Sequence, residues 1–252
     1  TSADKWTFSY WVKRIGLGTT QYLAGVAIDG NNETKLGFDD SNRAFWGDLQ
    51  GGSFVARLIS NRTFEDTSKW YHFVWSMDST QSTATDRQRL YVDGDEITSW
   101  NTELTRSQNG DYLWTKNATH RINWSSGEDL DGYLAEINHV DGQQLGPDTF
   151  GITDTSTGRW IPKSLGSITY GGTGYRLQFA NAAGQTIGDD TSGNGHDFTV
   201  SNFTTSDINT DSPTQNFITF DKDRYLGTQQ TTEEGGLTVY ASSGSGYTAM
   251  AA

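Results

Sequence analysis

The chain has 252 residues, and 18 Lys and Arg against 31 Asp and Glu give it a formal net charge of −13. This acidic balance argues against nucleic-acid binding, which needs clustered basic side chains. The absence of cysteine excludes disulfides, thiolate zinc sites and cysteine nucleophiles. No apolar stretch is long enough to predict membrane insertion. Only 33% of residues are hydrophobic, but nine Trp, eleven Tyr and twelve Phe indicate a folded chain with an aromatic core.

Short segments of alternating polar and apolar residues predict strands along the first 140 residues. The first, at residues 6–13, places four large apolar side chains on one face, namely Trp6, Phe8, Tyr10 and Val12. Further strands are predicted at Gln21–Ile28, Lys35–Asp39, Phe45–Leu49, Ser53–Ile59, Trp70–Met77, Arg89–Val92, His120–Asn123 and Gly132–His139. Gly, Asn, Asp and Ser clusters bound them, as is typical of turns. Many short strands without intervening helices predict an all-β antiparallel sandwich or barrel.

The pattern changes after about residue 142. One helical turn is predicted at 145–150, followed by strands at Tyr175–Phe179 and Asp197–Phe203. Residues 227–252 are rich in Gly, Ser and Thr, with one strand-like run at Leu237–Tyr240. Such a tail cannot form a core alone, so we expect it to pack on a neighbouring subunit or to lead into another module. The predicted organisation is a sandwich over residues 1–226, with a core at 1–141 and an extension at 142–226, and a low-complexity tail or assembly segment at 227–252.

Four stretches together resemble the laminin-G-like, concanavalin-A-like jelly roll. They are Trp6–Arg14, Trp70–Trp75, Leu90–Gly94 and Asp131–Ile137. The resemblance implies two antiparallel sheets that face each other, with a concave face that often binds sugar.

The continuation of the chain is similar to a version of this domain that is common in large virion proteins of tailed phages, especially marine ones. The stretches that carry this likeness are Asp141–Leu145, Trp160–Lys163, Gly188–Phe198 and Thr210–Thr214. It implies a location on the virion surface, contacts with other virion proteins, and a homo-oligomer of three or more chains.

Catalysis is one alternative, because the same fold hosts β-glucanases. A retaining glycosidase needs two carboxylates about 5–5.5 Å apart. The nearest candidates lie between residues 128 and 136. Asp131 and Glu136 differ by five positions and therefore point to opposite faces of a regular strand, whereas Glu128 and Glu136 would lie about 26 Å apart. The four histidines are not accompanied by a Gly-x-Ser-x-Gly elbow, so the pattern favours a protein that is not an enzyme.

A metal site is a second alternative. Asp190, Ser192 and Asn194, followed by a glycine, reproduce the alternating oxygen donors of a calcium loop, and Asp189 or Asp197 could complete the ligand set. Ser201 stands where the bidentate Glu of a complete EF-hand loop would be. The other interpretation is a structural turn in which Asp190 and Asn194 cap backbone amides.

Sugar binding would use exposed aromatic rings beside amides and carboxylates. Five aromatic residues lie in or near polar loops and are candidates for a carbohydrate site or a protein interface, namely Trp46, Trp100, Tyr112, Trp114 and Trp124. The competing interpretation is that, with few aliphatic residues available, these rings fill the core or an oligomer interface.

The sequence thus predicts a non-enzymatic structural protein displayed on a phage particle, either as a fibre or spike or as a head decoration, that contacts host glycans. The alternative is a free carbohydrate-binding module or polysaccharide hydrolase of the same fold. Calcium is the one cofactor that the sequence suggests.

Overall fold

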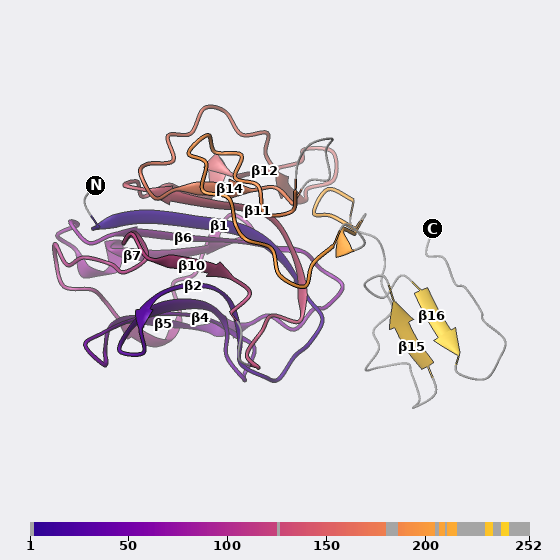
Figure 1. The fold of residues 1–252 in the computed structure, drawn as a ribbon, viewed down its shortest axis with the longest axis horizontal. Helices are drawn as coiled ribbons and strands as arrows, with labels where there is room; N and C mark the ends of the chain where they lie inside the picture. Colours follow the sequence, from indigo (N-terminus) through magenta and orange to yellow (C-terminus); the bar gives the residue numbers. More distant parts are fainter. Residues whose placement is uncertain are drawn as a thin grey trace.

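A computed structural model describes residues 3–124, 127–179, 186–204, 207–209, 211–215, 230–233 and 238–241. Two six-stranded antiparallel sheets face each other in this structure (Figure 1). The predicted all-β sandwich is therefore confirmed, and its arrangement is that of a concanavalin A-like jelly roll.

The first sheet has β1 and β6 near its centre. Its strand order is β14 (Tyr175–Leu177), β11 (Gly132–Asp141), β1 (Lys5–Arg14), β6 (Tyr71–Asp78), β7 (Gln88–Val92) and β8 (Asp95–Glu96). The order of the second sheet is β10 (Thr119–Ile122), β2 (Gln21–Asp29), β3 (Asn32–Phe38), β4 (Arg43–Gln50), β5 (Ser53–Thr63) and β9 (Trp100–Leu104).

The core between the sheets is built from the alternating residues of these strands. All four apolar residues predicted to share one face of β1 have no exposed surface. Trp6 stacks on Trp114 with ring centroids 5.0 Å apart, and Tyr10 stacks on Phe73 at 5.4 Å. The aromatic core predicted from composition is the one observed.

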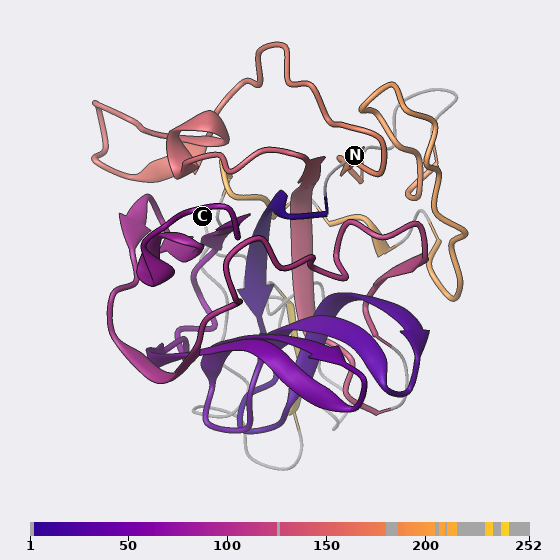
Figure 2. The same cartoon turned by 90° about the vertical axis from the view of Figure 1, so that its left-hand side faces the viewer.

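The polar face of β1 is buried as well, because the extension after β11 covers it. Thr7 donates to the carbonyl of Gln143 at 2.8 Å, and Trp160 Nε1 donates to the buried His72 Nδ1 at 2.9 Å. Both views place the first part of this extension, with β12 (Gly151–Thr153), on the side of the first sheet away from the second sheet (Figures 1 and 2). A second apolar cluster lies beneath it, formed by Val74, Val140, Phe150 and Tyr170.

The extension itself contains little regular structure. The predicted helical turn is present as a 3₁₀ turn at Pro147–Thr149, and a small hairpin pairs β12 (Gly151–Thr153) with β13 (Trp160–Pro162). Outside the extension, another 3₁₀ turn at Ala84–Asp86 precedes β7. The strand predicted at Asp197–Phe203 is wrong, because this segment has no ladder partner and runs as an irregular loop.

In the tail, β16 (Thr238–Ala241) corresponds to the strand-like run, and it pairs with β15 (Gln230–Glu233). The other residues of 227–252 lie outside the described part of the chain, so the predicted assembly segment stays a prediction. No helix within the described ranges has the length and apolar character needed to cross a membrane.

Candidate ligand-binding face

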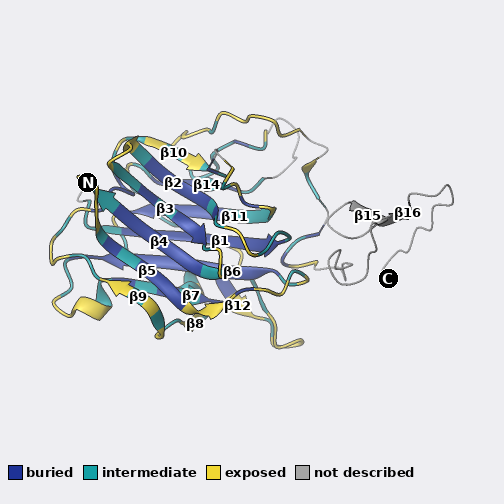
Figure 3. Cartoon of the chain, turned by 90° about the horizontal axis from the view of Figure 1, so that it is seen from below, coloured by how far each residue is buried: buried dark blue, intermediate teal, exposed yellow. Residues whose placement is uncertain are grey.

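The outer face of the second sheet is the open side of the sandwich. Figure 3 shows this sheet from below, with no described segment in front of β3, β4 and β5. The side chains that face outward include Tyr22 on β2, Lys35 on β3 and Phe45 on β4. Leu36 and Trp46, on β3 and β4, face the core without exposed surface. Because successive residues of a strand alternate between faces, the same strands build both the core and this open face.

Aromatic rings lie flat on the open face because glycines leave room beneath them. At Gly47 a Cβ atom would come within 2.7 Å of the Phe54 ring and 3.0 Å of the Phe45 ring. At Gly25 it would come within 2.7 Å of the Trp124 ring. Any larger residue at these two positions would therefore push the rings away from the sheet.

Cationic side chains are held between these rings. The Arg57 guanidinium lies 4.8 Å from the centroid of Phe54 and 5.6 Å from that of Phe45. The Lys35 ammonium lies 4.9 Å from the Tyr22 ring and 4.8 Å from the Trp124 ring. Such contacts stabilise a cation over the negative face of the ring, and here they fix the position of both charges.

The two cations differ in whether they have an anionic partner. Lys35 forms an ion pair of 2.8 Å with Glu33. Arg57 forms no ion pair within the described ranges, and its Nε atom is buried there without a hydrogen-bond acceptor. Guanidinium groups present a fork of N–H donors that matches a carboxylate. Arg57 is therefore a rigid, unused anion-binding group on a chain whose net charge is strongly negative.

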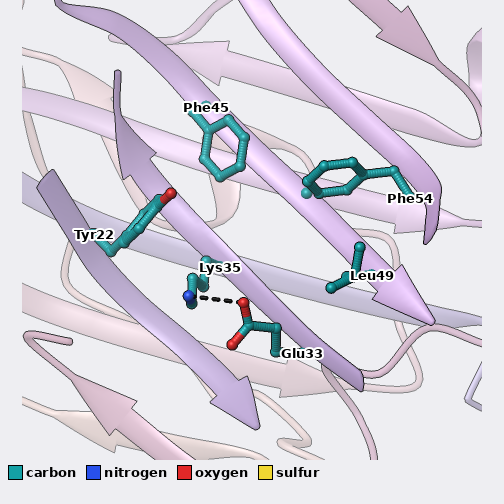
Figure 4. A pocket seen from close by; sticks show the side chains of 7 residues that line it. Tyr22, Glu33, Lys35, Phe45, Leu49 and Phe54 are labelled. Carbon is teal, nitrogen blue, oxygen red and sulfur yellow. Dashed lines mark ion pairs between the residues drawn. The ribbon is translucent and has the colours of Figure 1, made fainter. Parts of the chain in front are cut away.

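A shallow depression of about 50 Å³ lies between these side chains, lined by Tyr22, Glu33, Lys35, Phe45, Gly47, Leu49 and Phe54. Figure 4 shows the rings of Tyr22, Phe45 and Phe54 around it, with the Lys35–Glu33 ion pair beside them. The volume admits a small chemical group but no buried sugar ring. A larger ligand would therefore lie along the face rather than inside it.

The acidic neighbours affect the one ionisable ring on this face. Burial, together with the carboxylates of Glu128 and Glu33, raises the pKa of the Tyr22 hydroxyl above its ordinary value. Tyr22 is therefore a neutral hydrogen-bond donor as well as a stacking surface at ordinary pH.

Three of the five predicted sugar-contacting residues are core residues, and the prediction of exposure is wrong for them. Trp46, Tyr112 and Trp114 have no exposed surface. Trp46 packs against Trp6 at 5.7 Å, and its Nε1 donates to Thr34 at 3.1 Å. The physical reason is the scarcity of aliphatic residues, which leaves the rings to fill the space between the sheets.

The other two predicted residues lie at opposite edges of the second sheet. Trp124 is 6% exposed, follows β10 and borders the open face, where Arg121 and Lys35 lie over its ring. Trp100, on β9, is half-buried and packs against the main core. The structure therefore brings Trp124 to the open face and does not bring the other four together with it there.

The candidate calcium loop is arranged as a structural turn. Both carboxylate oxygens of Asp190 accept hydrogen bonds, from the amides of Arg176, Ser192 and His196 and from the Ser192 hydroxyl, at 2.8–2.9 Å. Burial alone would raise the pKa of Asp190, but these bonds lower it below its ordinary value.

The side chains of the other predicted calcium ligands also form hydrogen bonds with neighbouring residues. Asp197 accepts from the Asp190 amide, Asp189 accepts from Thr186, and Asn194 donates its amide hydrogens to the carbonyls of Gly171 and Gly174. Within the described residues no group of three acidic or histidine side chains is arranged to hold a metal ion. Asp190 caps backbone amides as the turn interpretation expects, whereas the Asn194 side chain donates to backbone carbonyls instead of accepting from amides.

Among the carboxylates considered for catalysis, that of Glu136 is held in an ion pair. Glu136 forms an ion pair of 2.9 Å with Arg176, at a position of β11 where the backbone φ is 47° and the register with β1 shifts. The backbone carbonyl of Asp131 accepts from the amides of Ile15 and Gly16.

Sequence reasoning missed Tyr22, Lys35, Phe45, Phe54 and Arg57 as a group. Each of them lies on a predicted strand, but no motif marks the face of that strand which carries it. One signal was available. On one face of the predicted strand, glycine alternates with large residues, as in Phe45, Gly47 and Leu49, whereas a face that packs into the core would not place a glycine among large side chains.

This geometry defines a lectin-type β-sandwich with one covered and one open sheet face. A family model described as the concanavalin A-like lectin/glucanases superfamily (Laminin_G_3) matches residues 1–144. The chain belongs to this family.

Solved structures that this chain is similar to include an SAP-like pentraxin from Limulus polyphemus, at 15% identity over 56% of this chain and 65% of that one, with a TM-score of 0.39. Domain 4 of the extracellular arabinanase AbnA from Geobacillus stearothermophilus, in complex with arabinotriose, has 18% identity over 56% and 63%, with a TM-score of 0.40. Mouse laminin α1 domains LG4-5 have 13% identity over 67% and 41%, with a TM-score of 0.40. The chain covers less than two thirds of each of them. No curated protein gives a significant match.

Proposed function

We propose that this chain is a non-enzymatic virion protein, displayed on a phage particle, that binds acidic glycans through the open face of the second sheet. The observation that carries the glycan proposal is the pairing of flat-lying rings with Arg57, whose donors have no acceptor in the described structure.

The two parts of this face suit different parts of an acidic sugar. Phe54 is 41% exposed, and its ring offers the apolar surface on which the C–H groups of a pyranose stack. Arg57, a few ångströms away, would pair with the carboxylate or sulfate of the same or the next sugar. Because the rings hold the guanidinium in place before binding, less conformational entropy is lost when the ligand arrives.

The carboxylate that lines the depression on this face favours binding over hydrolysis as its function. Glu33 is the carboxylate that lines the depression, and its charge is engaged by Lys35 at 2.8 Å. Hydrolysis of a glycosidic bond uses a pair of carboxylates, and the described residues that line this depression supply one.

The virion part of the proposal rests on the sequence resemblance. It extends to assembly as a homo-oligomer of three or more chains that contacts other virion proteins, with the tail at 227–252 as the assembly segment. Deleting residues 227–252 should leave the sandwich folded but prevent assembly. Normal assembly of the truncated chain would contradict this role.

Binding can be tested by isothermal titration calorimetry with polygalacturonate, and with dextran as a neutral polymer. Phe54→Ala and Arg57→Gln should each weaken binding to polygalacturonate roughly tenfold, which corresponds to about 1.4 kcal/mol. Two controls match them: Phe203→Ala, at an exposed position in the extension, and Arg62→Gln, at an exposed position at the end of β5.

If all four variants bind alike, the open face is not the binding site. If the wild-type chain binds no acidic glycan, the glycan proposal is wrong. Gold-labelled antibody on intact particles tests the virion part separately, because absence of label on accessible particles contradicts it. A stable monomer that binds or degrades polysaccharide, without particle labelling, would favour the free module or hydrolase.

A further inference from the structure

A buried ion pair joins the first strand to the end of the described extension. Lys13 Nζ lies 2.5 Å from Asp211 Oδ2, across 198 residues of sequence. Both side chains are 1% exposed. Removing two charges from water is expensive even when they pair, so complete burial of this pair calls for an explanation beyond ordinary surface ion pairing.

The other oxygen of the same carboxylate has a fixed donor. Trp70 Nε1 donates to Asp211 Oδ1 at 3.0 Å, and Trp70 is itself buried. The carboxyl group is thus held on one side by an indole N–H and approached on the other by an amine. Since Oδ2 is one bond from Cγ, Lys13 Nζ lies within about 3.8 Å of the Asp211 carbonyl carbon.

We propose that Lys13 and Asp211 form an intramolecular isopeptide bond. A proton passes from the Lys13 ammonium to Asp211 Oδ2, which gives a neutral amine and a neutral acid. The Nζ lone pair then attacks Cγ, while the C=O π electrons move to Oδ1. When this intermediate collapses, Oδ2 leaves with its own proton and a second proton from Nζ, so that the products are one amide and one water molecule.

The described contacts of Asp211 have roles in this reaction. Both side chains are 1% exposed, and keeping two charges out of water is costly, so conversion of the ion pair into a neutral amide is favourable. Trp70 Nε1 stabilises the negative charge that develops on Oδ1, as a donor in an oxyanion hole does. The positioning of two groups near the attack distance of about 3–3.5 Å supplies a large effective concentration. The product amide removes both buried charges.

The bond would tie the extension covalently to the centre of the first sheet. Lys13 lies on the outward face of β1, and Asp211 lies near the end of the described extension. A cross-link at this point prevents the extension from peeling away, and it constrains the unfolded chain over nearly its whole length. This inference is independent of glycan binding and of the virion proposal.

The test is the mass of the full-length wild-type chain under denaturing conditions. The expected result is a chain lighter than its sequence by one water molecule, together with a branched tryptic peptide that joins the Lys13 and Asp211 segments. Asp–Gly sequences such as Asp93–Gly94 also lose water by forming succinimides. Mild alkali reopens a succinimide but leaves an isopeptide intact, so treatment before digestion separates the two.

Variants then assign the chemistry. Lys13→Arg retains the positive charge but lacks the amine, and its mass should equal that of its sequence. Asp211→Asn should lose ammonia instead of water. Lys35→Arg, at the partly exposed ion pair with Glu33, should still lose water. A folded wild-type chain at its full sequence mass, or a mass loss without the branched peptide, overturns the proposal.

Discussion

Asp48 offers a sharp test of the electrostatics of the core. It lies on β4 with no exposed surface, and its Oδ2 accepts weakly from the Leu113 amide at 3.2 Å and from Gln50 at 3.3 Å. Its Oδ1 has no partner in the described structure. Burial raises the pKa of Asp48 from 3.8 to about 6, although these hydrogen bonds oppose the shift.

The sign of the effect follows from proton binding. Between pH 3.8 and about 6 the folded chain holds a proton on Asp48 that the unfolded chain has released, so the free energy of unfolding falls as the pH rises. The shift is about two pKa units, which corresponds to about 3 kcal/mol. Asp48→Asn is neutral at every pH and keeps an oxygen for the Leu113 amide. The variant should therefore be more stable than wild type by about 3 kcal/mol at pH 8, and by little at pH 4.

Urea unfolding followed by tryptophan fluorescence at pH 4, 5, 6, 7 and 8 measures this difference. Other groups titrate alike in both chains and cancel in the comparison. Asp40→Asn, which removes a carboxylate at an exposed turn position, is the control. If the free energy of unfolding of Asp48→Asn differs from that of wild type by a constant amount across this range, burial of the Asp48 charge does not determine the effect of this residue on stability.

Three further predictions concern the core and the covered face. Trp114→Ala should lower the free energy of unfolding by about 3–5 kcal/mol, because it empties the space beside Trp6; urea unfolding would show it. Trp160→Phe leaves the buried His72 Nδ1 without its donor, so it should lose about 1–3 kcal/mol and make the extension more sensitive to limited proteolysis. Burial lowers the pKa of His72 to about 3 and of His120 to about 4. As the pH drops below about 6.5, these imidazoles become protonated in the unfolded chain before they do so in the folded chain, so the free energy of unfolding should fall. This loss should outweigh the opposite effect of Asp48. An unchanged urea midpoint between pH 7 and 5 would contradict the prediction.

The alternation in β1 shows how far the sequence predicts this fold. The alternation of polar and apolar residues alone predicts one apolar face. The residues on it, Trp6, Phe8, Tyr10 and Val12, form the centre of the core. Period alone does not reveal what covers the opposite face. Lys13 on that face is buried because residues nearly two hundred positions later pack over it, and no local pattern specifies such a contact.

The candidate site was harder to predict, because apolar residues occupy both parities of the second sheet. In the run from Phe45 to Leu49 the signals conflict, because Gly47 marks the parity of Phe45 as outward, whereas Asp48 suggests the same for the parity of Trp46. Trp46 turned inward and Phe45 outward, whereas Trp46 was the residue proposed to contact ligand. The prediction was wrong for Trp114 for another reason: the residue lies outside the strands, but its ring turns into the core and packs on Trp6 and Phe8.

The contrast between the two outer faces leads to a last prediction that separates binding from stability. Phe150 is 3% exposed in the cluster beneath the extension, whereas Phe54 is 41% exposed on the open face. Phe150→Ala should lose about 3–5 kcal/mol, and Phe54→Ala less than about 1 kcal/mol, by urea unfolding. A ring that is costly to leave in water and contributes little to folding is best explained by a ligand that covers it. If Phe54→Ala proves as destabilising as Phe150→Ala, the rings of the open face are structural, and the argument for a binding face there loses its basis.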